Sequence, residues 1–408
     1  MAEDNKPGKS DLQEIIDQLP DPPAELLQRR QQMAQRQQMQ RQPQRNNTRG
    51  GPGQVFARGP FPEVQAFDED GNAVQLPQLF KGKYTVLVTG CLTCPVFRRT
   101  YAESEAVAAD YREKGVQFFY IYKTLAHPEL KGYISPQNLG ERLKHIEQAK
   151  KELQTSFTWL CDTMDNDVKN ALRAGPNSDY LINPEGRIVY SSRWTNAQGL
   201  RSALTRAVGR SDSETTVADL NLPNLDRPPR PPREATATRV VRPNGLATLK
   251  IVPESPEDTY YVKLRAEAEP QLLKTGKGRL YLGFFPDPVL GVHWNNLVDP
   301  MQYKLSVPEG VSASPLEATA RKGPGDSDTE PREFWVTFDG GELPQSIELE
   351  MNYFGCTDTM CLPFTQRYTV QMQQDMFEGW TYGFSRPERM GGNQQRRPQQ
   401  PQQNQRPR

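Results

Sequence analysis

The sequence predicts two folded domains of different class, an α/β domain followed by an all-β domain, with polar segments around them. Strand-like and helix-like stretches alternate from residue 56 to residue 208, whereas only short strand-like stretches follow from 249 to 372. The intervening segment carries Pro-Pro-Arg-Pro-Pro-Arg. Because 36 of the 408 residues are proline and only 35% are hydrophobic, a single globular core is excluded, and we expect two separate cores.

The first domain has three helix-like stretches between single strands and a hairpin. In chain order these are a strand at 84–88, a helix at 95–114, a strand at 116–122, a helix at 138–153, strands at 180–182 and 187–190, and a helix at 197–208. The last two strands flank Asn183-Pro184-Glu185-Gly186, a turn sequence typical of a hairpin. This order is that of a thioredoxin-like α/β sandwich. Cys161 ends an apolar run and is expected to be a buried strand residue.

The second domain contains strand signals and no convincing helix. The strand-like stretches, separated by turn residues, are 249–252, 260–264, 280–285, 335–338, 347–353 and 368–372. Several short strands at such spacing predict an immunoglobulin-like β-sandwich.

Composition sets the expected boundaries. We predict a disordered Gln/Arg/Pro-rich region at 1–54, the α/β domain at 55–210, a proline-stiffened linker at 211–240, the sandwich at 241–375 and a disordered tail at 376–408. One short amphipathic helix is expected at 11–19. We interpret the Gln/Arg-rich stretches at 28–50 and 389–408 as solvated tethers, the alternative being contact with RNA or an anionic surface.

Charge and hydropathy exclude several classes. The formal net charge is zero, so no global field draws the chain to nucleic acid. No run approaches the roughly 18 apolar residues of a membrane span. Residues 1–21 lack the n-region and h-region of a signal peptide, so the sequence leaves the compartment unknown, although paired cysteines and a sandwich domain favour an extracytoplasmic, periplasm-type location.

The cysteine pair Cys91 and Cys94 lies between the strand at 84–88 and the helix that begins at Pro95. Unpaired backbone N–H groups and the helix dipole favour a thiolate there, so we expect a low thiol pKa and redox or nucleophilic chemistry. The alternative is half of a zinc site, but the other pair, Cys356 and Cys361, has the wrong spacing for one.

Thr89-Gly90-Cys91-Leu92-Thr93-Cys94-Pro95-Val96-Phe97 resembles the active-site segment of the iodothyronine deiodinase family, with Cys94 at the selenocysteine position. The resemblance continues through Ala126-His127, His145, Asp162-Thr163-Met164 and the strands at 180–190, and so spans most of 56–208. It implies that Cys94 is the reactive group. Three departures from the family pattern put iodothyronine in doubt as the substrate. Position 94 is cysteine and not selenocysteine, Leu92 replaces a cysteine of the family, and Asp179 replaces a basic residue.

His127 and His145 are two of only three histidines. His127 follows a strand at the sheet edge where ligands bind in open α/β folds, and His145 lies beside the apolar stripe of its helix. The resemblance makes both active-site histidines, able to donate a proton or to stabilise a thiolate. The alternative for each is a structural or surface histidine.

The second pair lies in Tyr353-Phe354-Gly355-Cys356-Thr357-Asp358-Thr359-Met360-Cys361-Leu362-Pro363, between two strands. This segment resembles the N-terminal domain of the thiol:disulfide interchange (cytochrome c biogenesis) family, in which such a pair accepts electrons and passes them to other thiol proteins. The alternative is a disulfide that staples a hairpin.

Together these features predict a thiol-dependent oxidoreductase. Cys94 acts as nucleophile, Cys91 resolves, and His127 and His145 manage protons. The expected substrate is a halogenated aromatic or a peroxide, and Cys356/Cys361 re-reduces the site across the linker. We expect no bound cofactor and an external thiol or dithiol, small or protein, as reductant. The alternatives are thiol-disulfide exchange on exported proteins and a non-enzymatic, redox-regulated binding protein. The sequence does not fix the oligomeric state.

Overall fold

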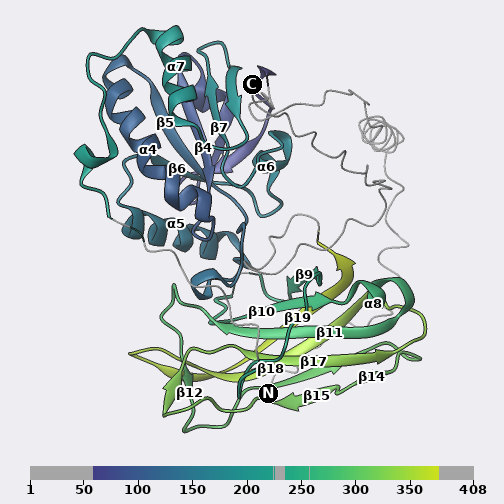
Figure 1. The fold of residues 1–408 in the computed structure, drawn as a ribbon. Helices are drawn as coiled ribbons and strands as arrows, with labels where there is room; N and C mark the ends of the chain where they lie inside the picture. Colours follow the sequence, from purple (N-terminus) through teal and green to yellow (C-terminus); the bar gives the residue numbers. More distant parts are fainter. Residues whose placement is uncertain (1–57, 224, 226–234, 257, 376–408) are drawn as a thin grey trace, which may run out of the picture. The chain divides into compact units, whose positions relative to one another are not determined.

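The computed structural model describes residues 58–223, 225, 235–256 and 258–375 (Figure 1). Within them the predicted fold class is confirmed, with a thioredoxin-like α/β domain followed by an all-β domain. The predictions for the two tails, the helix at 11–19 and the proline cluster of the linker lie outside the described residues.

The α/β domain is built on an eight-stranded sheet with the order β1-β8-β7-β4-β5-β6-β2-β3. β4, β5 and β6 are parallel, β7 pairs antiparallel with β4, and β8 pairs antiparallel with β7. The strands are β1 (Gly59–Pro60), β2 (Gln65–Phe67), β3 (Ala73–Gln75), β4 (Thr85–Gly90), β5 (Gln117–Tyr122), β6 (Thr158–Cys161), β7 (Asp179–Ile182) and β8 (Arg187–Ser192). β4 is therefore an inner strand, buried along its whole length.

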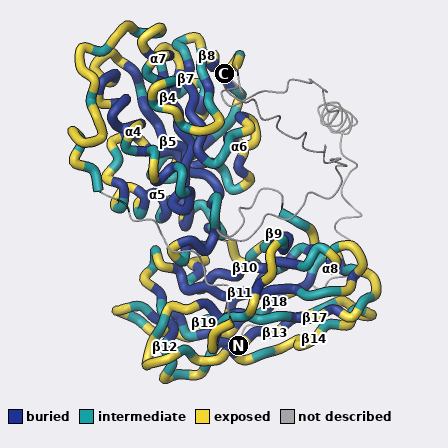
Figure 2. The backbone as a smooth tube through the Cα atoms, viewed as in Figure 1, coloured by how far each residue is buried: buried dark blue, intermediate teal, exposed yellow. Residues whose placement is uncertain are grey.

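Helices cover both faces of this sheet. The strands between them are largely buried (Figure 2). α4, α5 and α7 pack with one set of strand side chains, and α3 with the short α6 pack with the other. The helices are α3 (Leu76–Phe80), α4 (Pro95–Tyr111), α5 (Leu139–Leu153), α6 (Asp167–Ala171) and α7 (Ala197–Val208), with 3₁₀ turns η1 (Arg112–Lys114), η2 (Leu130–Gly132) and η3 (Val217–Leu220). Alternate residues of β4 serve the two cores, Val86 and Val88 facing one and Leu87 the other, as a two-residue repeat requires.

Sequence signals set the helix ends. The side chains of Asn138 and Asn196 cap α5 and α7 by accepting the backbone N–H of Glu141 and Gly199. The predicted helix at 95–114 ends its regular part at Tyr111 and closes in η1, where Gly115 adopts a left-handed conformation.

The all-β domain contains a nine-stranded sheet with the order β14-β17-β11-β10-β9-β19-β18-β13-β15. Its two halves pack on each other, since the ring of Phe284 from β11 stacks on Tyr303 from β13 at 6.0 Å between centroids. The strands are β9 (Ala247–Pro253), β10 (Val262–Ala268), β11 (Lys277–Pro286), β13 (Gln302–Ser306), β14 (Ala313–Ser314), β15 (Glu317–Thr319), β17 (Arg332–Asp339), β18 (Ser346–Cys356) and β19 (Cys361–Gln374), and β12 (Trp294–Asn295) pairs separately with β16 (Ser327–Asp328). β9 joins the halves by pairing with β10 and then with β19.

The expectation that this domain has no helix is wrong. α8 (Pro270–Thr275) is a six-residue helix that begins with Pro270 in its first turn and ends at Gly276, whose φ is +69°. Proline at the start and a left-handed glycine at the end are strong helix boundaries. The segment is too short to show a helical repeat in the sequence.

Residues 211–215 of the predicted linker pack on the α/β domain, whereas Thr238 and Val240 hydrogen-bond to Glu333 of β17. Ser211, Ser213 and Thr215 hydrogen-bond to Asp110 of α4, whose carboxylate also pairs with Arg201 of α7. Among the described residues, no helix is both long and apolar enough to cross a membrane.

Candidate active site

Cys91 and Cys94 lie in the loop that leads from β4 into α4. Cys94 is the N-cap of α4, and its Sγ accepts the backbone N–H of Phe97 at 3.4 Å. A backbone bond of 3.3 Å from Cys94 N to Cys91 O closes the loop between them. Both are free thiols, with 0% and 1% of their surface exposed. The sequence motif therefore forms a compact dithiol loop at a helix start.

Gly90 is required where β4 meets this loop. A Cβ on Gly90 would lie 2.6 Å from the ring of Phe97, whose side chain packs under the first turn of α4. Phe97 in turn contacts Tyr120 and Trp159 edge-on. The dithiol loop therefore packs on a buried aromatic floor formed by Phe97, Tyr120 and Trp159.

The loop after β5 covers the sulfur of Cys91. The backbone N–H of Ala126 donates to Cys91 Sγ at 3.3 Å, and the N–H of His127 donates to the hydroxyl of Thr93 at 3.3 Å. That hydroxyl lies 3.6 Å from Cys91 Sγ. The structure thus brings half-buried His127 next to the cysteine loop through its backbone.

Burial, rather than the helix start, controls the acidity of Cys94. Loss of hydration and, next, the negative charge of a Cys91 thiolate together raise the pKa of Cys94 to about 11, because the N–H of Phe97 opposes them only in part. The expectation of a low pKa at this helix N-terminus is therefore wrong for this conformation. The neutral thiol is the resting form at pH 7.

His145 reaches the loop through a tyrosine. Its Nδ1 and the hydroxyl of Tyr122 form a 3.0 Å hydrogen bond, and the N–H of Leu92 donates to the same hydroxyl at 3.5 Å. His145 is 1% exposed, so desolvation, helped by the charges of Lys263 and Arg142, holds its pKa well below the usual value. A neutral imidazole therefore positions the peptide between the two cysteines.

Buried ion pairs anchor the elements that carry the histidines. Glu129, two residues after His127, accepts from Arg242 Nη2 at 2.6 Å and contacts Arg265 Nε at 3.1 Å. Glu141, on the helix of His145, pairs with Lys263 Nζ at 2.7 Å. These carboxylates are at most 6% exposed. Both elements are therefore held by buried cations, Arg242 before β9 and Lys263 and Arg265 in β10.

The remaining residues of the motif are structural. Cys161 is buried at the end of β6 as predicted, and burial raises its pKa to about 12. Asp162 accepts the backbone N–H groups of Val168 and Lys169 in the first turn of α6, although Asn166 holds the N-cap position. Within the described chain, no three His, Cys, Asp or Glu side chains gather as a metal site requires.

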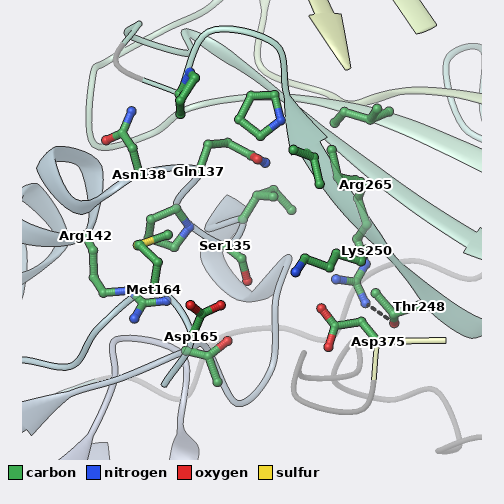
Figure 3. A pocket seen from close by; sticks show the side chains of 18 of the residues that line it. Ser135, Gln137, Asn138, Arg142, Met164, Asp165, Thr248, Lys250, Arg265 and Asp375 are labelled. Atoms are coloured by element: carbon green, nitrogen blue, oxygen red, sulfur yellow. Dashed lines mark hydrogen bonds between the residues drawn. The ribbon is translucent and has the colours of Figure 1, made fainter. Parts of the chain in front are cut away.

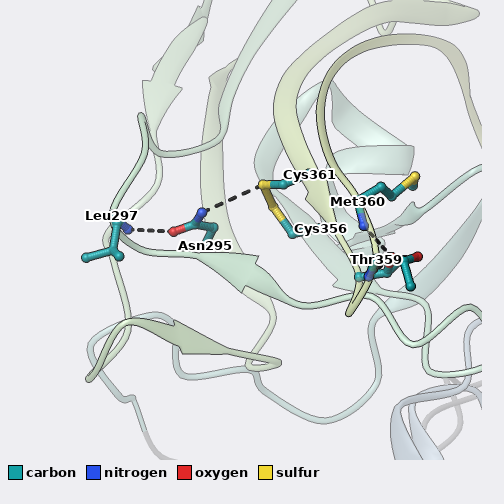
Figure 4. Close-up of a disulfide and its surroundings, with 7 residues drawn as sticks. Asn295, Leu297, Cys356, Thr359, Met360 and Cys361 are labelled. Atoms are coloured by element: carbon teal, nitrogen blue, oxygen red, sulfur yellow. Dashed lines mark hydrogen bonds between the residues drawn. A yellow bond between two sulfur atoms is a disulfide. The ribbon is translucent and has the colours of Figure 1, made fainter.

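Cys356 and Cys361 form a disulfide at the end of the β18–β19 hairpin, where they are directly opposite each other (Figure 4). Cys356 is 1% exposed, whereas Cys361 is exposed, and the side-chain amide of Asn295 lies 3.7 Å from its sulfur. Leu297 and Leu362, 73% and 51% exposed, lie in the neighbouring segments. One cysteine of this disulfide is therefore exposed and the other buried.

The family comparison concerns the α/β domain. Residues 57–191 match the model of the AhpC/TSA family. This is about a third of the chain, and it includes the loop of Cys91 and Cys94. No curated protein matches the chain. The resemblances to deiodinases and to the interchange-family domain stay predictions.

Solved structures give further likenesses, each at low identity. One is an uncharacterized conserved protein from Geobacillus kaustophilus, 24% identical over 41% of this chain and 92% of that one, with a TM-score of 0.31. A thiol:disulfide interchange protein from Bacteroides is 19% identical over 40% and 93%, with a TM-score of 0.30. A secreted disulfide oxidoreductase from Mycobacterium tuberculosis is 14% identical over 35% and 96%, with a TM-score of 0.28.

Sequence reasoning missed the residues that connect the site. Thr93 and Tyr122 stood inside matched motifs without a role, and Glu129 stood in none. A tyrosine that ends an inner strand next to a cysteine loop is a usable signal. The partners of Glu129 are more than 110 positions away, so nothing local indicates them.

Proposed function

We propose that this protein is a thiol-dependent oxidoreductase whose reactive group is the dithiol of Cys91 and Cys94. The observation that supports this most strongly is the pairing of two free thiols in one loop, with Cys94 Sγ on the first N–H groups of α4. Each sulfur accepts a backbone N–H group, from Phe97 to Cys94 and from Ala126 to Cys91, and such donors stabilise a forming thiolate. The AhpC/TSA match covers the same residues.

In the proposed reaction Cys94 attacks and Cys91 resolves. With a peroxide, the Cys94 thiolate takes one oxygen, the O–O bond breaks, and an alcohol or water leaves. Cys91 then displaces water from the sulfenate to give a Cys91–Cys94 disulfide. With a halogenated aromatic, Cys94 takes the halogen, carbon takes a proton, and Cys91 displaces halide. Each route moves two electrons from the two thiols to the substrate, and an external thiol restores them.

Thiol-disulfide exchange is the second candidate, favoured by the same geometry. Cys94 attacks a protein disulfide to form a mixed disulfide, and Cys91 releases the reduced protein. Here the substrate is large, so the burial of both sulfurs matters more. The loop at 126–133 has to move before a protein disulfide reaches Cys94.

His127 is the proposed proton donor, because its backbone lies against Thr93 and its side chain is only half-buried. His145 is a positioning residue in this account, since its ring contacts the hydroxyl of Tyr122. Its low pKa makes it a poor source of protons near pH 7.

The disulfide at Cys356 and Cys361 is proposed as an electron relay. The exposed sulfur of Cys361 accepts attack by an incoming thiolate, and buried Cys356 is the leaving group. A disulfide of this kind persists in an oxidising compartment, which supports an extracytoplasmic location. The hairpin staple remains the alternative role.

The function is tested by trapping the oxidised site. Reduced protein is mixed with peroxide, with insulin and with an iodinated phenol, quenched with acid and alkylated, and its cysteines are mapped by mass. We expect a Cys91–Cys94 disulfide with the true substrate, no turnover in Cys94→Ser, and an adduct on Cys94 in Cys91→Ser. Cys161→Ser is the matched control and should turn over normally. Loss of turnover in Cys91→Ser but not in Cys94→Ser would overturn the assigned roles.

A further inference from the structure

A cleft of about 710 Å³ lies where strands β9 and β10 diverge (Figure 3). The two strands pair only at Thr248–Glu267 and Ala247–Ala268, and from Leu249 onward β9 pairs with β19 instead. Residues 248–253 and 264–266 line the cleft on this side. Diverging strand edges offer an extended segment both backbone groups and alternate side-chain pockets.

The opposite wall comes from the α/β domain. It consists of residues 134–140, with Arg142 and the loop at 164–166. The cleft combines apolar and charged lining residues, and Figure 3 shows Arg142 and Asp165 on one side and Lys250, Arg265 and Asp375 on the other. Its apolar lining residues include Ile134, Pro136, Leu139, Met164, Leu249 and Ile251. An occupant with apolar or aromatic side chains and few charges fits this lining.

The described chain ends at this cleft. Asp375 is one of its lining residues, and the N–H of Asp375 donates to the carbonyl of Thr248 at 2.8 Å. The last described residue is therefore part of the cleft lining. An occupant tethered at its entrance has a high effective concentration and needs little intrinsic affinity.

The sequence that follows Asp375 differs from the rest of the tail. Trp380, Tyr382 and Phe384 alternate with small or polar residues, whereas 389–408 has no aromatic residue. A spacing of two places all three side chains on one face of an extended segment. From Asp375 to Trp380 the chain spans at most about 17 Å, which keeps the aromatic run close to the cleft.

We propose that residues 376–388 dock into this cleft, with Trp380, Tyr382 and Phe384 on its apolar lining and Glu378 near Lys250. The cleft borders the segments that lead to both site histidines. Thr124, one of its lining residues, leads into the loop of Ala126 and His127, and residues 134–140 lead into the helix of His145. The docked segment therefore braces the elements that cover the dithiol. This proposal does not depend on the substrate or on the redox chemistry.

Two truncations test the docking. One chain ends at Asp375, and its matched control ends at Glu388 and loses only the Gln/Arg-rich part. Hydrogen exchange is followed at the backbone amides of residues 248–252 and 262–266. We expect the control and the full chain to exchange alike and the chain ending at Asp375 to exchange at least tenfold faster there. Equal exchange in all three chains would overturn the proposal and leave the cleft to another occupant.

A full-length variant guards against a truncation artefact. Trp380→Ala, Tyr382→Ala and Phe384→Ala together should reproduce the fast exchange, while Gln394→Ala, Gln395→Ala and Gln399→Ala should not. A labelled peptide of residues 376–388 should bind the chain ending at Asp375 and slow its exchange again. No binding by this peptide, with the truncated chain folded by circular dichroism, would contradict the proposal.

Discussion

Each of the two cysteine pairs lies at the end of a strand, but the fold gives the two pairs opposite environments. Cys91 and Cys94 follow an inner strand, lie among aromatic side chains and remain thiols. Cys356 and Cys361 close a hairpin, are oxidised, and leave one cysteine exposed. The difference shows that burial, more than the number of residues between the two cysteines, decides which pair an incoming thiolate can reach. The hairpin disulfide includes an exposed cysteine, whereas both thiols of the dithiol are buried and the loop at 126–133 contacts Cys91.

The loop at 126–133, whose backbone contacts Cys91, gives the largest expected change in thiol reactivity. Replacing Glu129→Gln removes one of the two buried carboxylates that pair with Arg242 and Arg265, Glu267 being the other, so we expect the free energy of unfolding to fall by up to about 3 kcal/mol. Alkylation of Cys91 and Cys94 in the native chain should speed up at least tenfold, while reduction of the hairpin disulfide should not change.

Glu330→Gln is the control for that variant. Its carboxylate is 55% exposed and lies 3.5 Å from Arg239, so its loss should cost less than about 1 kcal/mol. Urea unfolding and timed alkylation measure both variants. Equal alkylation rates for Glu129→Gln and the wild type would show that Glu129 does not hold the loop.

A buried carboxyl in the thiol domain makes its stability depend on pH. Asp179 pairs with Val88 in the register of β7 on β4, and burial raises its pKa to about 7 from 3.8. Between these values the folded chain keeps a proton that the unfolded chain has released. Raising the pH from 4 to 7 should therefore lower the free energy of unfolding by up to about 4 kcal/mol through this group.

Asp179→Asn should remove that dependence and stabilise the α/β domain at pH 8. The matched substitution in the sandwich is Asp328→Asn. Burial raises the pKa of the Asp328 carboxyl, but hydrogen bonds from Arg332 and Asn296 lower it by more, so that the pKa is lowered overall. Removing this carboxyl should destabilise the chain at pH 8. Thermal melting from pH 4 to pH 8 separates the two, and a melting temperature of Asp179→Asn below that of wild type at pH 8 would refute the account of Asp179.

The hairpin disulfide is expected to add about 2 kcal/mol, because it closes a loop of only six residues. The double change Cys356→Ser and Cys361→Ser should cost that much stability. If the pair is a relay, re-reduction of a Cys91–Cys94 disulfide by an external dithiol should also slow. If the re-reduction rate were unchanged while stability fell, the relay would be refuted and the disulfide would have only its structural role in the hairpin.

Removing one hydroxyl at the dithiol should have the smallest effect. Tyr122→Phe deletes the bridge between His145 and the N–H of Leu92, which we expect to cost about 1 kcal/mol. Alkylation of Cys91 should rise a few-fold as the loop loosens. Tyr303→Phe, which removes a bond to Pro315 in the sandwich, should leave alkylation unchanged. The same alkylation rate in both variants would mean that Tyr122 does not position the loop.

The strongly patterned elements were predictable from the sequence, and the site only in part. α7 falls on the predicted residues 197–208, because its ends carry a cap and a glycine. The strands β1, β2 and β3 were missed, since two or three residues show no repeat. The dithiol loop follows from its motif. The raised pKa of Cys94 does not, because it depends on packing from α4, the loop after β5 and the aromatic floor together.

The central claim is that Cys94 is the nucleophile of a buried dithiol and Cys91 its resolving partner. Peptide mapping after a single turnover, with the oxidised protein quenched in acid, tests it most directly. The account predicts a Cys91–Cys94 disulfide in wild type, a substrate adduct on Cys94 in Cys91→Ser and none on Cys91 in Cys94→Ser. An adduct on Cys91 in Cys94→Ser, or turnover that leaves both thiols free in wild type, would contradict it.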